Sequence, residues 1–112
     1  MANKLYKPLL IDSIKATADI EQNRFIGFDG NYCGAGTKAL GVSEVPTENG
    51  QFAPVGVIGI FLVEAGENLT AGDEVTSDAE GKAIRVSDNA KINGYSLDTA
   101  TVGTLVRIVR GV

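Results

Sequence analysis

Residues 54–64, PVGVIGIFLVE, form a nearly continuous apolar run and decide the fold. A run of this length is typical of a strand that is buried on both faces, because successive side chains of a strand point to opposite sides. Two glycines interrupt the run, Gly56 and Gly59, and glycine inside a strand indicates a bulge or a bend. We therefore predict that residues 54–64 form the central strand of a sheet and that this strand bends.

Shorter β-type segments flank the central run on both sides, and each is bounded by turn residues. They cover residues 24–29, 38–43, 74–77, 82–87, 92–97 and 103–109, with turns at 29–31, 47–50 and 79–81. Residues 14–23 have the only helix-compatible spacing, which is poor, and we interpret them as extended. About eight short strands at regular spacing predict an all-β fold, a small barrel or sandwich.

A weak internal repeat accompanies these strands. The pattern Lys-x-x-Gly-x-Ser occurs at residues 38–43 and 91–96, and Val-Gly follows at residues 55–56 and 102–103. Residues 20–29 also resemble residues 69–78. The three offsets are 53, 47 and 49 residues, the differences between the paired positions. Two related half-barrels would explain the repeat, and chance similarity within a strand-rich chain is the alternative.

Length and charge bound the domain organisation. The chain has 112 residues, the length of one domain, and we expect an extended N-terminal arm at 1–12 followed by a single domain at 13–112. Residues 1–17 and 101–112 each carry a charge of +2, whereas residues 18–100 carry −8, which gives the net −4. The basic ends either form an ordinary solvated surface or contact an acidic partner. The net negative charge argues against nucleic-acid binding, and no run reaches the roughly 20 apolar residues of a membrane helix.

The composition excludes most catalytic chemistry. The sequence has no histidine and one cysteine, so it has no Ser-His or Cys-His pair, no disulfide and no CxxC metal motif. We interpret Cys33 as a small buried apolar residue because no base is available to it. The acids between residues 64 and 80 lack EF-hand spacing, and we interpret them as solvated turn residues. We therefore predict no enzymatic activity, no metal and no cofactor.

One alternative function has a sequence signal. Residues 65–82, AGENLTAGDEVTSDAEGK, are similar to the turn-and-strand pattern of biotinyl and lipoyl carrier domains, in which a lysine at a hairpin tip is modified. Lys82 would be that lysine, although the residues that flank it in the carrier motif are missing. A carrier, or another small β-barrel binding module, is the alternative interpretation, and an adduct on Lys82 would reveal a carrier.

A family resemblance covers nearly the whole chain. Residues 18–43, which contain NRFIGFDGNYCGAGTKALGVS, and residues 57–109, which contain VEAGENLTAGDEVTSDAEGKAIRV, resemble the two halves of small bacteriophage capsid-decoration proteins, also called cement or head-stabilising proteins. Gly103 matches the small residue before the terminal strand of that family. Residues 47–54 depart from the family pattern and look like an inserted loop.

The resemblance implies a structural virion protein with a small β-barrel or β-tulip-like fold. Such a protein is made in the host cytoplasm and binds the outer capsid surface, where it contacts the major capsid protein at junctions between capsomers. It stabilises the expanded shell and often does so as a homotrimer. The resemblance implies no catalysis, no cofactor, no nucleic-acid partner and no membrane partner.

The N-terminal arm is the candidate capsid contact. Pro8 favours an extended backbone, and an extended arm can add a strand to the edge of a partner's sheet. The candidate contact residues are Ala2, Asn3, Lys4, Leu5, Tyr6, Lys7, Pro8 and Leu9, with Arg107 and Arg110 as secondary candidates for capsid or subunit contacts. A frayed terminus is the alternative. We expect deletion of residues 2–8 to leave a folded protein that no longer coats capsids.

Overall fold

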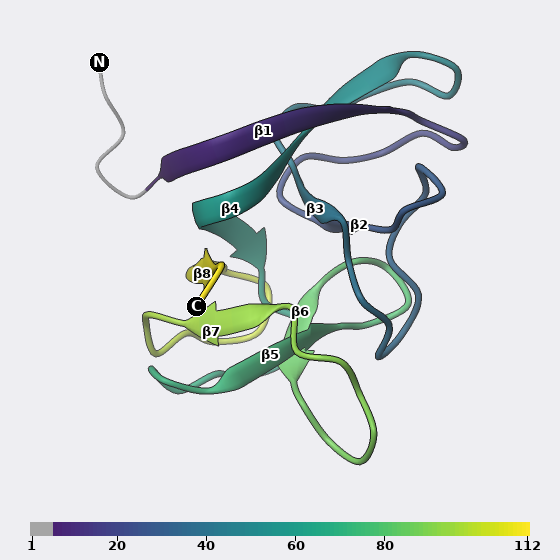
Figure 1. Cartoon of the computed structure of the whole chain (residues 1–112). Coiled ribbons are helices and arrows are strands. Elements are labelled where there is room, and N and C mark those ends of the chain that lie inside the picture. Colours follow the sequence, from purple (N-terminus) through teal and green to yellow (C-terminus); the bar gives the residue numbers. More distant parts are fainter. Residues whose placement is uncertain (1–5) are drawn as a thin grey trace.

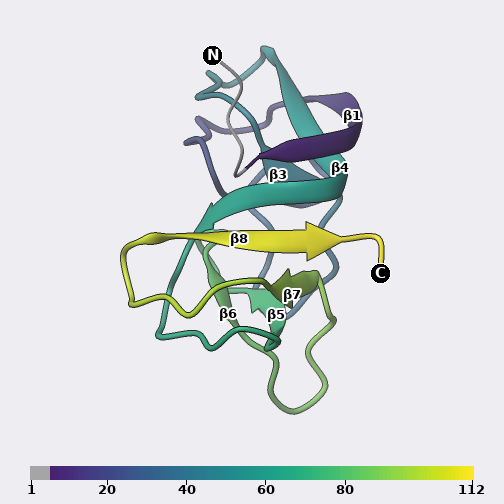
Figure 2. The same ribbon diagram turned by 90° about the vertical axis from the view of Figure 1, so that its left-hand side faces the viewer.

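In the computed structural model, which describes residues 6–112, one sheet of eight strands curls into a nearly closed barrel (Figures 1 and 2). The strands are β1 (Lys7–Lys15), β2 (Phe25–Ile26), β3 (Gly41–Ser43), β4 (Phe52–Glu64), β5 (Glu74–Ser77), β6 (Ala83–Arg85), β7 (Gly94–Ser96) and β8 (Leu105–Arg110). Their order in the sheet is β2-β3-β4-β8-β7-β5-β6, and β1 pairs with β4. Within residues 6–112 there is no helix long and apolar enough to cross a membrane.

Strand β4 is the central strand, as the apolar run predicts. It pairs with β1 and β3 along its first part and with β8 along its second part. Figure 1 shows the strand bending between these two parts. Gly59, at the bend, has a φ of 134° and pairs with both Pro8 and Arg110. A side chain there would strike the backbone of β1, so the bend requires glycine.

The sheet is an internal duplication. Each half is a four-stranded unit in which the last strand lies between the first and the third: β1-β4-β3-β2 in the first half and β4-β8-β7-β5 in the second. Ile14 pairs with Ala53 in the first half, and Val63 pairs with Val106 in the second. Val63 is the equivalent of Ile14, at an offset of 49 (63 − 14), and Val106 is the equivalent of Ala53, at an offset of 53 (106 − 53). The same offsets relate the β2–β3 pairing to the β5–β7 pairing and the β3–β4 pairing to the β7–β8 pairing. Strand β4 therefore serves twice, as the last strand of one half and the first strand of the next.

The duplication confirms two of the three sequence offsets and corrects the third. Val102 and Gly103 do not match residues 55–56 of β4, because they lie in the turn before β8. That turn corresponds to the one at Asn49 and Gly50, and both glycines have positive φ, 91° and 87°. Within the repeat, residues 47–51 are therefore a regular turn, and residues 52–54 begin β4. The four additional residues lie in the second half, within the β5–β6 hairpin, where the offset rises from 49 to 53.

Several predicted strands are shorter in the structure than in the sequence pattern. Residues 38–40 are outside β3, and the backbone N–H of Ala39 donates instead to the side-chain oxygen of Asn93 at 2.8 Å. The extended prediction for residues 14–23 holds only to Lys15, after which Ile20 makes a single isolated bridge with Thr47. In both places the backbone bonds a residue that is distant in the chain, Asn93 in one case and Thr47 in the other. The local sequence gives no sign of such a partner.

The core fills the barrel between the two halves. The main cluster consists of Phe25, Cys33, Ala39, Val42, Phe61, Val63, Ala65, Leu69, Val75, Ala83, Val106 and Ile108. A smaller cluster lies beneath β1 and consists of Ala16, Ile20, Ile26 and Val55. Cys33 is fully buried in the main cluster, which confirms its interpretation as an apolar core residue.

Candidate functional site

The N-terminal candidates lie partly in the sheet. Residues 7–9 belong to β1, and this strand continues to Lys15, across the boundary expected between residues 12 and 13. Tyr6 packs edge-on against Phe61, with 5.9 Å between ring centroids. Ala2, Asn3, Lys4 and Leu5 lie outside the described residues. The deletion of residues 2–8 would therefore remove a core contact and two paired residues of β1, so it does not test an arm alone.

An apolar groove lies where β1, β4 and β8 meet. Leu9 is 83% exposed, and together with Ile58 and Val112 it forms most of the groove wall, with Lys7 at the rim. Leu9 is also where the β1–β4 register shifts, so its side chain is not held in the ordinary alternation of the strand. Exposed apolar residues that gather in this way are typical of a surface that contacts another molecule. We call this surface the Leu9 groove.

Arg110, a secondary contact candidate from the sequence, is largely buried. The residue is only 7% exposed, and its guanidinium donates to the carbonyl oxygens of Val57 (2.9 Å), Asn93 (2.8 Å), Ala39 (3.2 Å) and Leu40 (3.2 Å). Burial lowers the pKa of this guanidinium. Arg110 therefore links β4 and the segment before β3 to the segment before β7.

Arg107 remains partly accessible. Its guanidinium bonds the carboxylate of Asp98, with 2.7 Å between Nη2 and Oδ1, and both side chains are about one-third exposed. The hydrogen bond from Arg107 lowers the pKa of Asp98. Because an exposed pair of this kind is worth little to stability, a partner can reorganise it at small cost.

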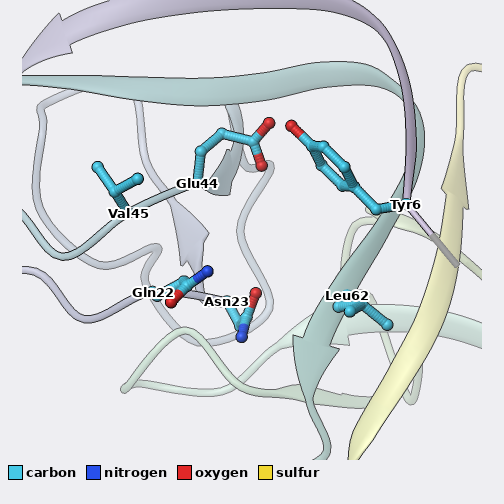
Figure 3. A pocket seen from close by; sticks show the side chains of 6 residues that line it. All are labelled: Tyr6, Gln22, Asn23, Glu44, Val45 and Leu62. Atoms are coloured by element: carbon cyan, nitrogen blue, oxygen red, sulfur yellow. The ribbon is translucent and has the colours of Figure 1, made fainter. Parts of the chain in front are cut away.

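A second hollow contains an unusual carboxyl group. Glu44 follows β3 and reaches into a pocket of about 270 Å³ lined by Tyr6, Gln22, Asn23, Val45 and Leu62 (Figure 3). Its Oε1 atom is buried and has no hydrogen-bond partner among residues 6–112. Burial raises the pKa of Glu44 from 4.5 to about 7. We call this hollow the Glu44 pocket; the sequence analysis missed it because a single glutamate after a strand carries no local signal.

The raised pKa of Glu44 makes a stability prediction. A carboxyl group whose pKa is higher in the folded than in the unfolded chain stabilises the fold below the unfolded value and loses that contribution as pH rises through the folded value. We expect the free energy of unfolding of the wild type, relative to that of Glu44→Gln, to fall as pH rises from about 5 to 8. Urea unfolding at several pH values measures this difference, and parallel curves for the two proteins would contradict it.

The remaining sequence candidates are structural. Lys82 follows the β5–β6 turn, with Nζ at 3.5 Å from the Oε2 of Glu64 and 3.6 Å from the Oε1 of Glu80. Glu64 also accepts a hydrogen bond from Arg24, so this acid links the hairpin to the start of β2. Within residues 6–112, no group of three histidine, cysteine or acidic side chains is placed to hold a metal ion.

The fold and its surface define the class of the protein: an internally duplicated β-barrel with an apolar groove beside its central strand. A family model described as phage cement protein matches residues 8–111. The chain therefore belongs to the phage cement protein family and is a structural protein associated with the phage capsid.

A solved structure supports the same fold. The head fiber gp8.5 N base in bacteriophage phi29 aligns with a TM-score of 0.75 and 22% identity, over 91% of this chain and 93% of that chain. Nearly complete coverage of both chains shows that the two share one architecture from end to end. No curated protein sequence matches this chain.

Proposed function

We propose that this protein binds the outer surface of the phage capsid, where it contacts the major capsid protein at junctions between capsomers and stabilises the expanded shell as a homotrimer. It is made in the host cytoplasm and acts without catalysing a reaction. The match to the phage cement family over residues 8–111 is the observation that carries this proposal. The carrier alternative has no comparable support, since Lys82 is engaged by two acids.

Several physical features of the chain support a role as cement. Two strand sets joined through one shared strand give a stiff body with short turns, and stiffness lowers the entropy that binding must overcome. Modest contacts suffice when a trimer engages several equivalent sites, because the linked sites have a high effective concentration.

We propose that the Leu9 groove is the main capsid contact. Lys7 and Pro8 already pair with β4, so a partner meets the side chains of residues 7–9 or the outer edge of β1. The residues 2–5 remain part of the proposed contact, and Arg107 is a secondary candidate beside Asp98. Arg110 also lines this groove, but it is only 7% exposed and its guanidinium is bonded to backbone carbonyl oxygens, so we give it a smaller part in the contact.

Placing a charge in the Leu9 groove is expected to abolish coating. Leu9→Glu adds a carboxylate to an exposed site, so folding should be unaffected, whereas docking would desolvate that charge. We expect at least about a tenfold loss of affinity for expanded empty heads, measured by cosedimentation. Unchanged coating by Leu9→Glu would remove the groove from the contact surface.

The matched control for this experiment is Val102→Glu. Val102 is 61% exposed and precedes β8, whereas Val112 in the groove follows that strand. The same charge is therefore introduced at the opposite end of one strand. We expect the control to coat heads like the wild type, and wild-type protein that fails to bind expanded heads at all would refute the proposed function.

A further inference from the structure

Four side chains that can form hydrogen bonds line the Glu44 pocket: Tyr6, Gln22, Asn23 and Glu44. Figure 3 shows the phenol of Tyr6 and the carboxyl group of Glu44 reaching into the pocket from opposite sides, with the amides of Gln22 and Asn23 below them. Val45 and Leu62 supply the apolar part of the wall. The amide and phenol oxygens can all accept hydrogen bonds, and the buried Oε1 of Glu44 has no donor within the described residues.

A buried acceptor without a donor is costly to a fold. Such a group normally costs about 1–3 kcal/mol, and more if it is charged. Within residues 6–112 Glu44 forms no ion pair; the guanidinium of Arg24 is bonded to Glu21 and Glu64, and its Nε atom also has no partner there. The carboxyl group of Glu44 therefore has hydrogen-bonding capacity that no described residue uses.

The internal duplication shows that the fold itself does not need this acid. The backbone N–H of Glu44 donates to Pro54, and the equivalent N–H of Leu97 donates to Arg107, so the two residues occupy the same place in the two halves. The second half uses a leucine there. A polar residue in the first half is thus a feature of the pocket rather than a requirement of the repeat.

The chemistry of the pocket selects its occupant. Carboxylate, amide and phenol oxygens around one hollow match a guanidinium, which is planar, always charged and carries five donors. The acidic body of the chain, −8 over residues 18–100, attracts the same kind of group. The Leu62 and Val45 side chains suit the methylene stem of an arginine.

We propose that the Glu44 pocket receives an arginine side chain presented by the protein partner, and that the guanidinium of this arginine bonds the Glu44 carboxylate. This inference rests on the proposed function, since the partner is the capsid protein to which the chain binds. Tyr6 lines the pocket and immediately precedes β1, whose residues Lys7 and Leu9 line the Leu9 groove.

The first test uses the full-length protein and a defined probe. N-acetyl-arginine-N-methylamide is titrated into ¹³C-labelled protein, and the side-chain signals of Glu44, Gln22 and Asn23 are followed by NMR. We expect saturable shifts and a lower titration midpoint for Glu44, because a bound cation favours the ionised carboxylate. The other titratable side chain that lines the pocket is Tyr6, and Arg24, Glu21 and Glu64 are paired with one another. The citrulline analogue, which is neutral and of similar shape, should bind at least about tenfold more weakly. Equal binding of both probes would overturn the proposal.

The second test separates this inference from the proposed function. Glu44→Gln should reduce affinity for expanded heads about tenfold, since a neutral amide replaces the charged acceptor. Glu44→Leu, the residue of the second half, should bind as poorly while remaining folded, and Glu48→Gln is a control that removes an exposed acid from the next turn. If the wild type coats heads and Glu44→Gln coats them equally, the pocket proposal fails and the function stands. If the wild type does not coat heads, the function fails, and the arginine titration still decides the pocket.

Discussion

Replacing Arg110 by alanine is expected to lower the free energy of unfolding by about 3–5 kcal/mol, a large part of the stability of a domain this size. The guanidinium supplies donors to four carbonyl oxygens that lie in β4, before β3 and before β7. Alanine would leave those oxygens without a donor and a cavity in their midst. Because the four oxygens belong to both halves, the loss should loosen the barrel as a unit. Urea or thermal unfolding followed by circular dichroism measures the effect.

Arg107→Ala is the matched control for Arg110. Both arginines lie in β8, three residues apart, but Arg107 makes a half-exposed pair with Asp98. Such pairs contribute about 0–1 kcal/mol, so this variant should unfold almost like the wild type. Arg110→Lys keeps the charge but has three donors and no planar fork, so it should fall between the two. Wild-type stability of Arg110→Ala, combined with a loss of capsid coating, would give Arg110 a larger part in the contact.

Gly56→Ala is expected to destabilise the protein by about 3 kcal/mol, or roughly 10–15 °C in Tm. A Cβ atom at Gly56 would overlap the ring of Phe61, which is fully buried in the main core. The ring cannot move away, because the core around it is closely packed. Thermal unfolding of the variant tests this directly.

A second substitution shows whether the ring is the cause. Leucine at position 61 makes room beside residue 56, so Gly56→Ala combined with Phe61→Leu should cost less than the sum of the two single changes. Gly34→Ala is the control, since its Cβ would meet only the exposed side chain of Thr37 at 3.3 Å. Additive single and double effects would mean that Gly56 is needed for a reason other than the ring.

The same pair shows how the two halves have diverged. Gly56 corresponds to Val109 in the second half, and Phe61 corresponds to Asp12 of β1 in the first half, as the paired registers show. Both Gly56 and Phe61 lie in β4, the strand that the two halves share. Neither the aromatic ring nor the glycine is kept at the equivalent position of the other half. Strand β1, which carries Asp12 at that position, lies on the outside of the barrel with most of its residues exposed.

The amino-acid sequence by itself indicated the all-β fold, its central strand and two offsets of the repeat. The central position of β4 follows from its apolar run, and the turn at Gly50 follows from a backbone conformation that glycine adopts most easily. The offsets of 49 and 53 are visible because equivalent positions in the two halves keep similar residues. These properties depend on neighbours in the chain, so local sequence carries them.

Only the tertiary structure decided the roles of the charged residues. Arg107 and Arg110 look alike in sequence, yet one pairs with Asp98 at the surface and the other bonds carbonyls inside the barrel. The Glu44 pocket and the Leu9 groove likewise arise where segments distant in the chain meet, as Leu9 meets Val112. Which atoms are buried, unsatisfied or exposed depends on contacts between distant segments, because those contacts decide which groups are shielded from water. The all-β fold could therefore be predicted from the sequence, whereas the groove and the pocket could be located only in the tertiary structure.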